Sequence, residues 1–500
     1  MKRQALFAVL AATLFVRLPG IGWGLPPTTP QVRASDLRSS YAFDEDDILT
    51  GVAKASVARL DFDPNEYHWG TLHIELVLLA LDGAEAVGLF GVPWRSAYYN
   101  LVDGDFVRVY VIGRLVAVAA ALLTVGLLFQ FCEEWAGIFA AMLVAVSPSH
   151  MLQSNQVRVD ITMTALLILT LLAAVKTQVD GRPRRFLLLG VAVGLAIAGK
   201  YSAVTAAAAI ALTALLFKRF PWRSVLAVAV GATLGFIVGN PYVVVKPLAF
   251  YETISRHVTN HAHLPPEFII APAKLLEMHI VNLARFSMGL PAFLLGGVGL
   301  LGMLRRRSPR DWMILAGILG YLAILLPLRW PLVRYDVPLT VLLALCAGIG
   351  LERLPKPWRY FLTGAALGMP FAACIAQLHY MRAPHPANVI LERILNIVPP
   401  GTAIARSFRE APPLDPKVYP LGPDVSPGHT DAPTWVLTTD LSDERYQATT
   451  LSVLQHAGYE EVVRAQSERI LAWATLGERS APHDWKYTHP SFTLYRKKSP

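Results

Sequence analysis

Long apolar segments, separated by short polar ones, recur through the first 380 residues of the chain. A helix needs about 20 mostly apolar residues to cross the hydrocarbon core of a bilayer. Segments that approach this length lie at about 4–21, 108–130, 136–152, 161–176, 186–203, 204–217, 222–240, 288–304, 311–328, 332–351 and 360–379. The pattern predicts a mainly α fold, a polytopic membrane helix bundle of about 11 spans.

One further segment, residues 72–90, is nearly long enough to span but contains Glu75, Asp82 and Glu85. An acidic residue near the middle of a spanning helix costs roughly 2.5–3.5 kcal/mol. Counting this segment as a span would also move the next three basic loops to the outer side. We therefore predict an interfacial helix on the outer surface, with a twelfth span as the alternative.

Basic residues are unevenly divided between alternate short loops. The rich loops hold Lys176, Arg182, Arg184 and Arg185; Lys218, Arg219 and Arg223; Arg305, Arg306, Arg307 and Arg310; and Arg353, Lys356 and Arg359. Cytoplasmic loops carry this excess, so the N-terminus is expected inside and the region after residue 380 outside. No small-residue cleavage site follows the first segment, which favours an uncleaved anchor over a signal peptide.

Three long regions should then face the outside, at about 22–107, 241–287 and 381–500. Since the cytoplasmic loops are short, the functional site is expected on the outer face. The last region contains short alternating stretches and one amphipathic stretch at about 442–457, typical of a small α/β domain. The predicted division is a transmembrane catalytic domain over 1–380 and an extracytoplasmic α/β domain over 381–500.

Composition agrees with a membrane protein. Charged residues make up 16% of the 500 residues and hydrophobic ones 54%, whereas a soluble protein has about 25% charged residues. This balance excludes a soluble enzyme and a disordered chain. The net charge of +9 is explained by cytoplasmic loops, and no nucleic-acid-binding motif is present. The odd number of cysteines, 3, argues against a disulfide framework.

The densest charge cluster, Asp44-Glu45-Asp46-Asp47, follows Tyr41-Ala42-Phe43 on the predicted outer side. One reading is a solvated acidic turn or the N-terminus of a helix, where carboxylates are favoured. The other is a general base with or without a bound metal ion, because neighbouring carboxylates in a pocket can do either. Spacing alone leaves both readings open.

Further short motifs follow this cluster over roughly residues 1–350. They are His68-Trp69-Gly70-Thr71-Leu72-His73, Arg114, Ser147-Pro148, Arg158-Val159-Asp160, Gly194-Leu195-Ala196, Gly199-Lys200-Tyr201, Asn240-Pro241-Tyr242, and Arg334-Tyr335 with Pro338. In order, spacing and outer placement they resemble the GT-C superfamily of polyprenyl-phosphate-sugar-dependent glycosyltransferases. That superfamily includes protein O-mannosyltransferases and lipid A aminoarabinose transferases. The family's common Pro-Pro-Leu is absent after Trp69, and the spacing from Arg334 to Pro338 is shorter than usual.

The resemblance implies an inner-membrane enzyme that moves a sugar from a polyprenyl-phosphate donor to a hydroxyl acceptor, with inversion. Asp44 corresponds to the family's catalytic Asp and is expected to take the acceptor proton. Glu45 is expected to support it or to bind metal. The sugar, the acceptor and the polyprenyl length are left open.

Cations at the outer membrane edge would stabilise the leaving phosphate. The candidates are Lys200, Arg158, Arg329 and Arg334, with Tyr335 beside the last. The alternative for each cation is a side chain that extends to the lipid headgroups. Asp160 is a candidate cavity residue, or a simple partner for Arg158.

Histidines supply the remaining candidates. His68 and His73 are expected to line the acceptor cavity. His257 and His261 are four residues apart, so one helix would place them on the same face, and with Glu45 they form a candidate site for a divalent metal ion. Acceptor binding or loop packing is the alternative, and no cofactor is required by the sequence.

Three other functions compete with this interpretation. A transporter would need ionisable residues deep in its spans or an inverted repeat. Apart from Arg17, Arg114 and Lys200 the predicted spans contain few such residues, and no repeat is evident. An oligosaccharide polymerase or ligase would use a pyrophosphate-linked donor and would favour a basic outer loop without the early Asp-Glu pair. A non-catalytic scaffold would tolerate the change Asp44→Asn.

Overall fold

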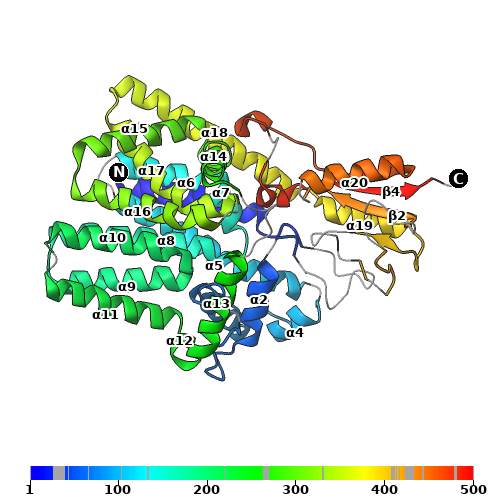
Figure 1. The fold of residues 1–500 in the computed structure, drawn as a ribbon, viewed down its shortest axis with the longest axis horizontal. Coiled ribbons are helices and arrows are strands. Elements are labelled where there is room, and N and C mark those ends of the chain that lie inside the picture. Colours follow the sequence, from blue (N-terminus) through cyan, green and yellow to red (C-terminus); the bar gives the residue numbers. More distant parts are fainter. Residues whose placement is uncertain are drawn as a thin grey trace.

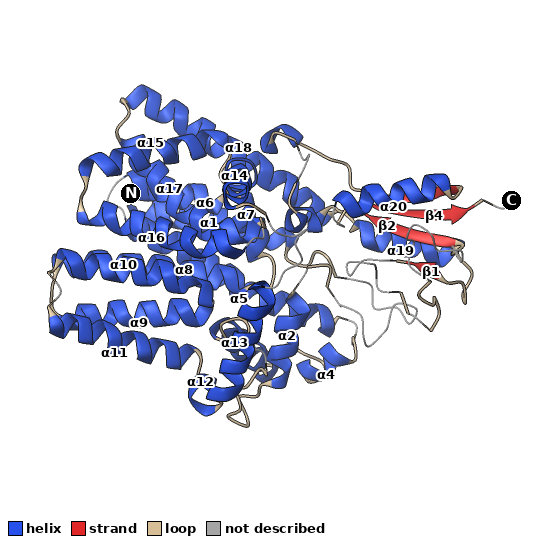
Figure 2. Ribbon diagram, in the orientation of Figure 1, coloured by secondary structure: helices blue, strands red, loops and turns tan. Residues whose placement is uncertain are grey.

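The computed structural model describes residues 2–25, 40–42, 44–65, 67–102, 104–131, 135–219, 221–262, 270–328, 331–406, 412, 414–415, 417–422, 433–441, 444–477 and 481–498. Most of these residues form helices, and four strands lie near the C-terminus (Figure 2). The mainly α fold with a small C-terminal α/β part is confirmed.

The first half of the chain forms α1 (Lys2–Phe15), α2 (Glu45–Lys54), α3 (Leu72–Ala86), α4 (Trp94–Tyr99), α5 (Asp105–Phe131), α6 (Trp135–Ala145), α7 (Pro148–Ser154), α8 (Val159–Val179), α9 (Pro183–Gly199), α10 (Val204–Phe217) and α11 (Trp222–Gly239). The second half continues with α12 (Tyr242–Val245), α13 (Pro247–Ala262), α14 (Pro272–Asn282), the π-turn η4 (Leu283–Ser287), α15 (Leu290–Arg306), α16 (Pro309–Leu325), the 3₁₀ turn η6 (Val333–Asp336), α17 (Val337–Glu352) and α18 (Lys356–Arg382).

Each of the 11 predicted segments coincides with a helix or a broken helix. In the described part of the chain, five helical segments are long and apolar enough to cross a membrane: α5, α8, α11, Val333–Glu352 and Lys356–Ile397. The pair α6 and α7, bent by 59°, makes a sixth if it is one span. The chain is thus a multi-pass membrane protein, and the full count of 11 spans stays a prediction.

Helix α3 covers most of the doubtful segment 72–90 and is not among these long apolar helices. Two of its three acidic side chains bind the following helix: Nε1 of Trp94 donates to Asp82 at 2.7 Å, and the Trp94 amide donates to Glu85 at 3.0 Å. These bonds offset part of the cost of burying the two carboxylates, whereas Glu75 accepts from the Thr71 hydroxyl. Its interfacial position stays a prediction.

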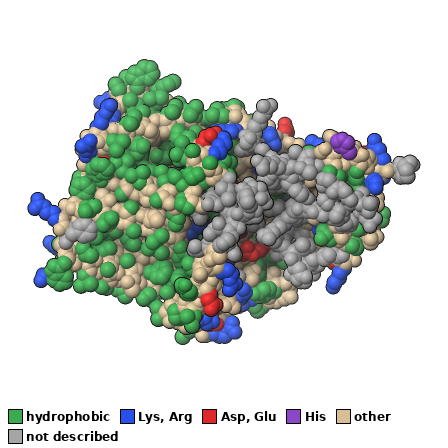
Figure 3. Space-filling model, viewed as in Figure 1, with side chains coloured by type: hydrophobic (Ala, Val, Ile, Leu, Met, Phe, Trp, Pro, Cys, Tyr) green, Lys and Arg blue, Asp and Glu red, His purple; other side chains and the backbone are tan. Residues whose placement is uncertain are grey.

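Glycine allows two bundle helices to approach closely. A Cβ added to Gly190 on α9 would lie 2.2 Å from the carbonyl oxygen of Val228 on α11, and one on Gly231 would lie 2.3 Å from that of Leu187. Small residues at such crossings are typical of membrane helix pairs. In Figure 3, hydrophobic side chains cover the helical part, and Lys and Arg gather at the end of the bundle opposite the sheet.

The C-terminal part contains α19 (Pro386–Ile397), β1 (Ile404–Ala405), β2 (Trp435–Thr439), α20 (Glu444–His456), β3 (Tyr459–Ala465), the 3₁₀ turns η7 (Ala472–Thr475) and η8 (His483–Thr488), and β4 (Phe492–Lys497). The sheet order is β1-β2-β4-β3, with β1 parallel to β2 and the other pairs antiparallel. The predicted helix at 442–457 is α20. The division at residue 380 stays a prediction.

One hydrophobic core joins the two parts. It includes Phe286 and Cys374 from the bundle together with Trp485 and Leu494 from the C-terminal region. Figure 1 shows the sheet at one end of the bundle, with α2, α4, α12 and α13 at the same end. The long loops predicted to face one side therefore gather there.

Candidate functional site

Asp44 lies immediately before α2, with a left-handed backbone (φ 73°) that Asp adopts more readily than most residues. Its Oδ2 atom accepts hydrogen bonds from Nη1 of Arg158 and from Nη1 of Arg334, each at 2.7 Å. The Asp44 side chain is 11% exposed. The acidic cluster therefore both begins a helix, as the first reading held, and contributes a carboxylate to a nearly buried site.

The charge around Asp44 is strongly positive. Burial raises the pKa of its carboxyl, but the charges of Arg334, Arg158 and Lys200 and the hydrogen bond from Arg158 outweigh this, and the pKa is lowered. A lowered pKa keeps the carboxylate ionised and makes it a weaker base while both arginines hold it.

Arg158 occupies the position just before α8 and is almost fully buried. Its Nε atom donates to Oε1 of Gln156 at 2.8 Å. Its Nη2 atom is also buried, and none of the described residues accepts a hydrogen bond from it. Buried donors are nearly always paired, so this atom is suited to an acceptor from a bound molecule.

Lys200 and Tyr335 complete the cluster. Lys200, at the end of α9, donates to Oδ1 of Asp160 at 2.6 Å and lies 4.8 Å from the centre of the Tyr335 ring. The guanidinium of Arg334 lies 5.2 Å from the same ring. The alternative for Asp160, a pair with Arg158, is not what the structure shows: Asp160 binds Lys200, and the side chain of Arg158, which precedes the helix, binds Asp44 instead.

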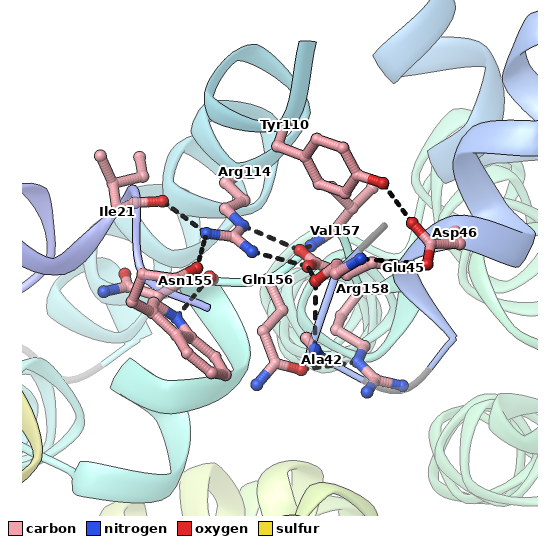
Figure 4. A network of polar contacts seen from close by, with 12 residues as sticks. Ile21, Ala42, Glu45, Asp46, Tyr110, Arg114, Asn155, Gln156, Val157 and Arg158 are labelled. Atoms are coloured by element: carbon pink, nitrogen blue, oxygen red, sulfur yellow. Dashed lines mark hydrogen bonds and ion pairs between the residues drawn. The ribbon is translucent and has the colours of Figure 1, made fainter. Parts of the chain in front are cut away.

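Glu45 has a different environment from Asp44, although the two are adjacent. Both carboxylate oxygens bind Arg114 of α5, at 2.9 and 2.6 Å, and both residues are fully buried. The Val157 amide donates to Glu45 at 2.7 Å, and Arg114 also donates to the carbonyls of Ile21 and Trp23, each at 2.7 Å (Figure 4).

This network ties the segment that begins α2 to α5 and to the turn before α8. Burial raises the Glu45 pKa, but Arg114 and the other hydrogen bonds outweigh it and lower the pKa. A bidentate, buried pair of this kind fixes backbone positions. Glu45 therefore positions Asp44 and Arg158 relative to each other.

The structure describes the side chains of two of the four histidine candidates. His73 is buried on α3, with Nδ1 2.8 Å from Oγ1 of Thr162. Burial lowers its pKa to about 4 despite the opposing charge of Asp160. The His68 ring lies 3.8 Å from that of Trp69. The side chains of His257 and His261, and all of Arg329, lie outside the described residues.

No three potential metal-binding side chains gather in the part of the chain that the structure describes. Of the candidate set of Glu45, His257 and His261, the structure describes only the side chain of Glu45, whose two oxygens bind Arg114. The metal site stays a prediction.

Two residues of the site have no counterpart among the predicted site residues. Arg114 was noted only as part of a motif, although a buried Arg in an apolar helix signals a carboxylate partner. Asp484, from the C-terminal region, binds the backbone of Val333 and Arg334 at 3.0 and 2.8 Å. No local pattern marks Asp484.

Comparison with known proteins gives one family match and several similar structures. Residues 92–244 match the model of the family described as dolichyl-phosphate-mannose-protein mannosyltransferase. This segment contains Arg114, Arg158 and Lys200. No curated protein sequence matches the chain.

Two solved structures with a similar fold illustrate the structural comparison. One is ArnT from Cupriavidus metallidurans bound to undecaprenyl phosphate (14% identity, 98% of this chain and 97% of that chain covered, TM-score 0.47). The other is the Archaeoglobus fulgidus oligosaccharyltransferase tethered with an acceptor peptide (12% identity, 92% and 72% covered, TM-score 0.49). The family match over residues 92–244 agrees with the resemblance to GT-C glycosyltransferases inferred from the motifs, which include protein O-mannosyltransferases.

Proposed function

We propose that the protein is a membrane glycosyltransferase that transfers a sugar from a polyprenyl-phosphate donor to a hydroxyl acceptor. One observation carries the proposal: two arginines, 158 and 334, converge on one carboxylate oxygen of Asp44, and Arg158 keeps a buried donor atom without a partner among the described residues. A base beside phosphate-binding cations is what this reaction needs. The family match over residues 92–244 supports the same class.

In the reaction, the acceptor oxygen attacks the anomeric carbon and its proton passes to Asp44. The bond between the anomeric carbon and the phosphate oxygen breaks with inversion, and the polyprenyl phosphate leaves with one additional negative charge. Arg158, Arg334 and Lys200 stabilise that charge. The Tyr335 ring holds the last two cations by cation–π contacts.

The donor also changes the strength of the base in this proposal. Without it, Arg158 and Arg334 both bind Asp44 and lower its pKa. A phosphate attracts the same guanidinium groups, because Arg binds phosphate oxygens strongly. Drawing them away from Asp44 raises its pKa and makes it a better base only when the donor is present.

The remaining assignments are proposals about placement. The site faces the outer side of the inner membrane, with the N-terminus in the cytoplasm and residues 381–500 outside. The gathering of Lys and Arg at the end of the bundle opposite the sheet supports this orientation (Figure 3). Asp160 holds Lys200 in place, and His68 and His73 lie toward the acceptor side.

The experiment is a panel of radiolabelled polyprenyl-phosphate sugars, given to membranes that carry the natural protein or no protein. Consumption of one donor only in membranes that carry the protein supports the proposal and identifies the sugar. Consumption only of pyrophosphate-linked donors added to the same panel would contradict it.

A further inference from the structure

Arg334 lies in η6, and the first amides of a helical turn have no partner within it. Here the partner comes from the far end of the chain. The two carboxylate oxygens of Asp484 accept from the Val333 amide at 3.0 Å and from the Arg334 amide at 2.8 Å. Asp484 is 1% exposed.

The turn that carries Asp484, η8, is itself fixed by contacts with η4, with α18 and with His385. The Trp485 ring lies 4.8 Å from that of Phe286. The Thr488 hydroxyl donates to Gln377 of α18 at 2.6 Å, and Nε2 of His385 lies 2.8 Å from the Tyr487 carbonyl oxygen. These contacts hold Asp484 beside the first two residues of η6.

We propose that Asp484 is a positioning residue for Arg334, so that the C-terminal region completes the phosphate-binding site. The inference rests on the proposed function, because it assigns Arg334 to the donor phosphate. A carboxylate that binds two successive amides fixes the start of η6 and hence the position of the Arg334 guanidinium. Displacements of about 1 Å at such sites cost roughly 100-fold.

The test measures the Kd of radiolabelled undecaprenyl phosphate for the purified full-length protein in detergent. In Asp484→Asn the remaining side-chain oxygen still accepts from one backbone amide. The new NH₂ group faces the other amide, and two donors cannot form a hydrogen bond. Asp484→Asn should therefore weaken binding roughly 10- to 100-fold. The matched control is Asp440→Asn, since Asp440 also accepts from a backbone amide, that of Ser491 at 2.7 Å, but lies in the sheet region. It should bind normally.

A double-variant cycle separates positioning from loss of structure. If Asp484 acts through Arg334, Asp484→Asn has no further effect on the Kd when combined with Arg334→Gln. A general structural defect would weaken binding in both backgrounds and would overturn the inference. If Asp484→Asn does not fold, Asp484→Glu provides the same comparison.

The results also separate this inference from the proposed function. Normal binding by Asp484→Asn, with binding lost in Arg334→Gln, overturns the positioning role alone. Failure of the natural protein to bind undecaprenyl phosphate overturns the proposed function and the inference with it.

Discussion

The Nη1 atom of Arg334 lies 2.7 Å from Oδ2 of Asp44, although 290 positions separate the two residues in the chain. The same oxygen binds Arg158 at 2.7 Å. A proposed base is therefore held by the cations proposed to bind the leaving group. This shared contact makes the pH dependence, the donor affinity and the rate interdependent.

The pH dependence of transfer should respond to Arg158. Asp44 acts in its ionised form. Because its pKa is lowered, the acid limb of the plot of kcat/KM against pH should lie below the pH range in which carboxyl groups usually ionise. Arg158→Gln removes one charge that lowers the pKa, so the limb should move to higher pH. The rate should also fall roughly 10- to 100-fold, as expected for a charge-assisted hydrogen bond.

The control for this profile is Arg182→Gln, which alters an exposed arginine paired with Asp180. Its acid limb should match that of the natural protein. An unchanged limb in Arg158→Gln would contradict the assignment of the limb to Asp44.

Loss of Glu45 should affect stability more than chemistry. Glu45→Gln leaves Arg114 buried without its ionic partner, which costs about 3–5 kcal/mol for pairs of this type. Thermal unfolding in detergent should show a large fall in the midpoint. Glu461→Gln, in an exposed pair with Arg464, should change the free energy of unfolding by less than about 1 kcal/mol. Equal effects for both variants would argue against the structural role of the buried pair.

Glu75 should make stability fall as the pH rises. Burial raises its pKa to about 7, against the opposing hydrogen bond from Thr71. The unfolded chain releases this proton near the ordinary value, so folding is penalised increasingly from about pH 4.5 to 7. Glu75→Gln should stabilise the protein by about 1–3 kcal/mol at pH 8.5 and little at pH 4.5.

The matched control is Glu277→Gln, because Glu277 is exposed and pairs with Lys274 within one helix. Its unfolding midpoint should shift equally at both pH values. An effect of Glu75→Gln that does not change with pH would show that the pKa of Glu75 is the same in the folded and the unfolded chain, which would contradict this prediction.

The sequence was sufficient to predict the helices, because apolar segments that cross a bilayer are long and unambiguous. It also predicted Asp44, Arg158, Lys200 and Arg334 as candidate site residues, all on the side of the membrane expected to be outside. It did not reveal which carboxylate each cation binds. Asp160 lies two positions from Arg158, and residues at this spacing do not face each other on a helix.

Contacts between distant segments were the least predictable. The pair of Glu45 with Arg114 depends on how α5 packs beside the start of α2. The contact of Asp484 with Arg334 depends on how the C-terminal region packs against η6. Neither has a periodic or local signal. Opposite charges in apolar surroundings must pair, but the packing of distant segments selects the partner.

The most direct test measures donor-lipid binding and transfer on the same variant, Asp44→Asn. The account predicts that transfer falls roughly 10²- to 10⁴-fold, as for loss of a general base. Undecaprenyl phosphate should bind as tightly as before or more tightly, because Arg158 and Arg334 no longer bind a carboxylate. The control, Asp47→Asn, alters an exposed residue of the same cluster and should leave both unchanged. Normal transfer by Asp44→Asn, or weaker binding of the phosphate lipid, would contradict the account.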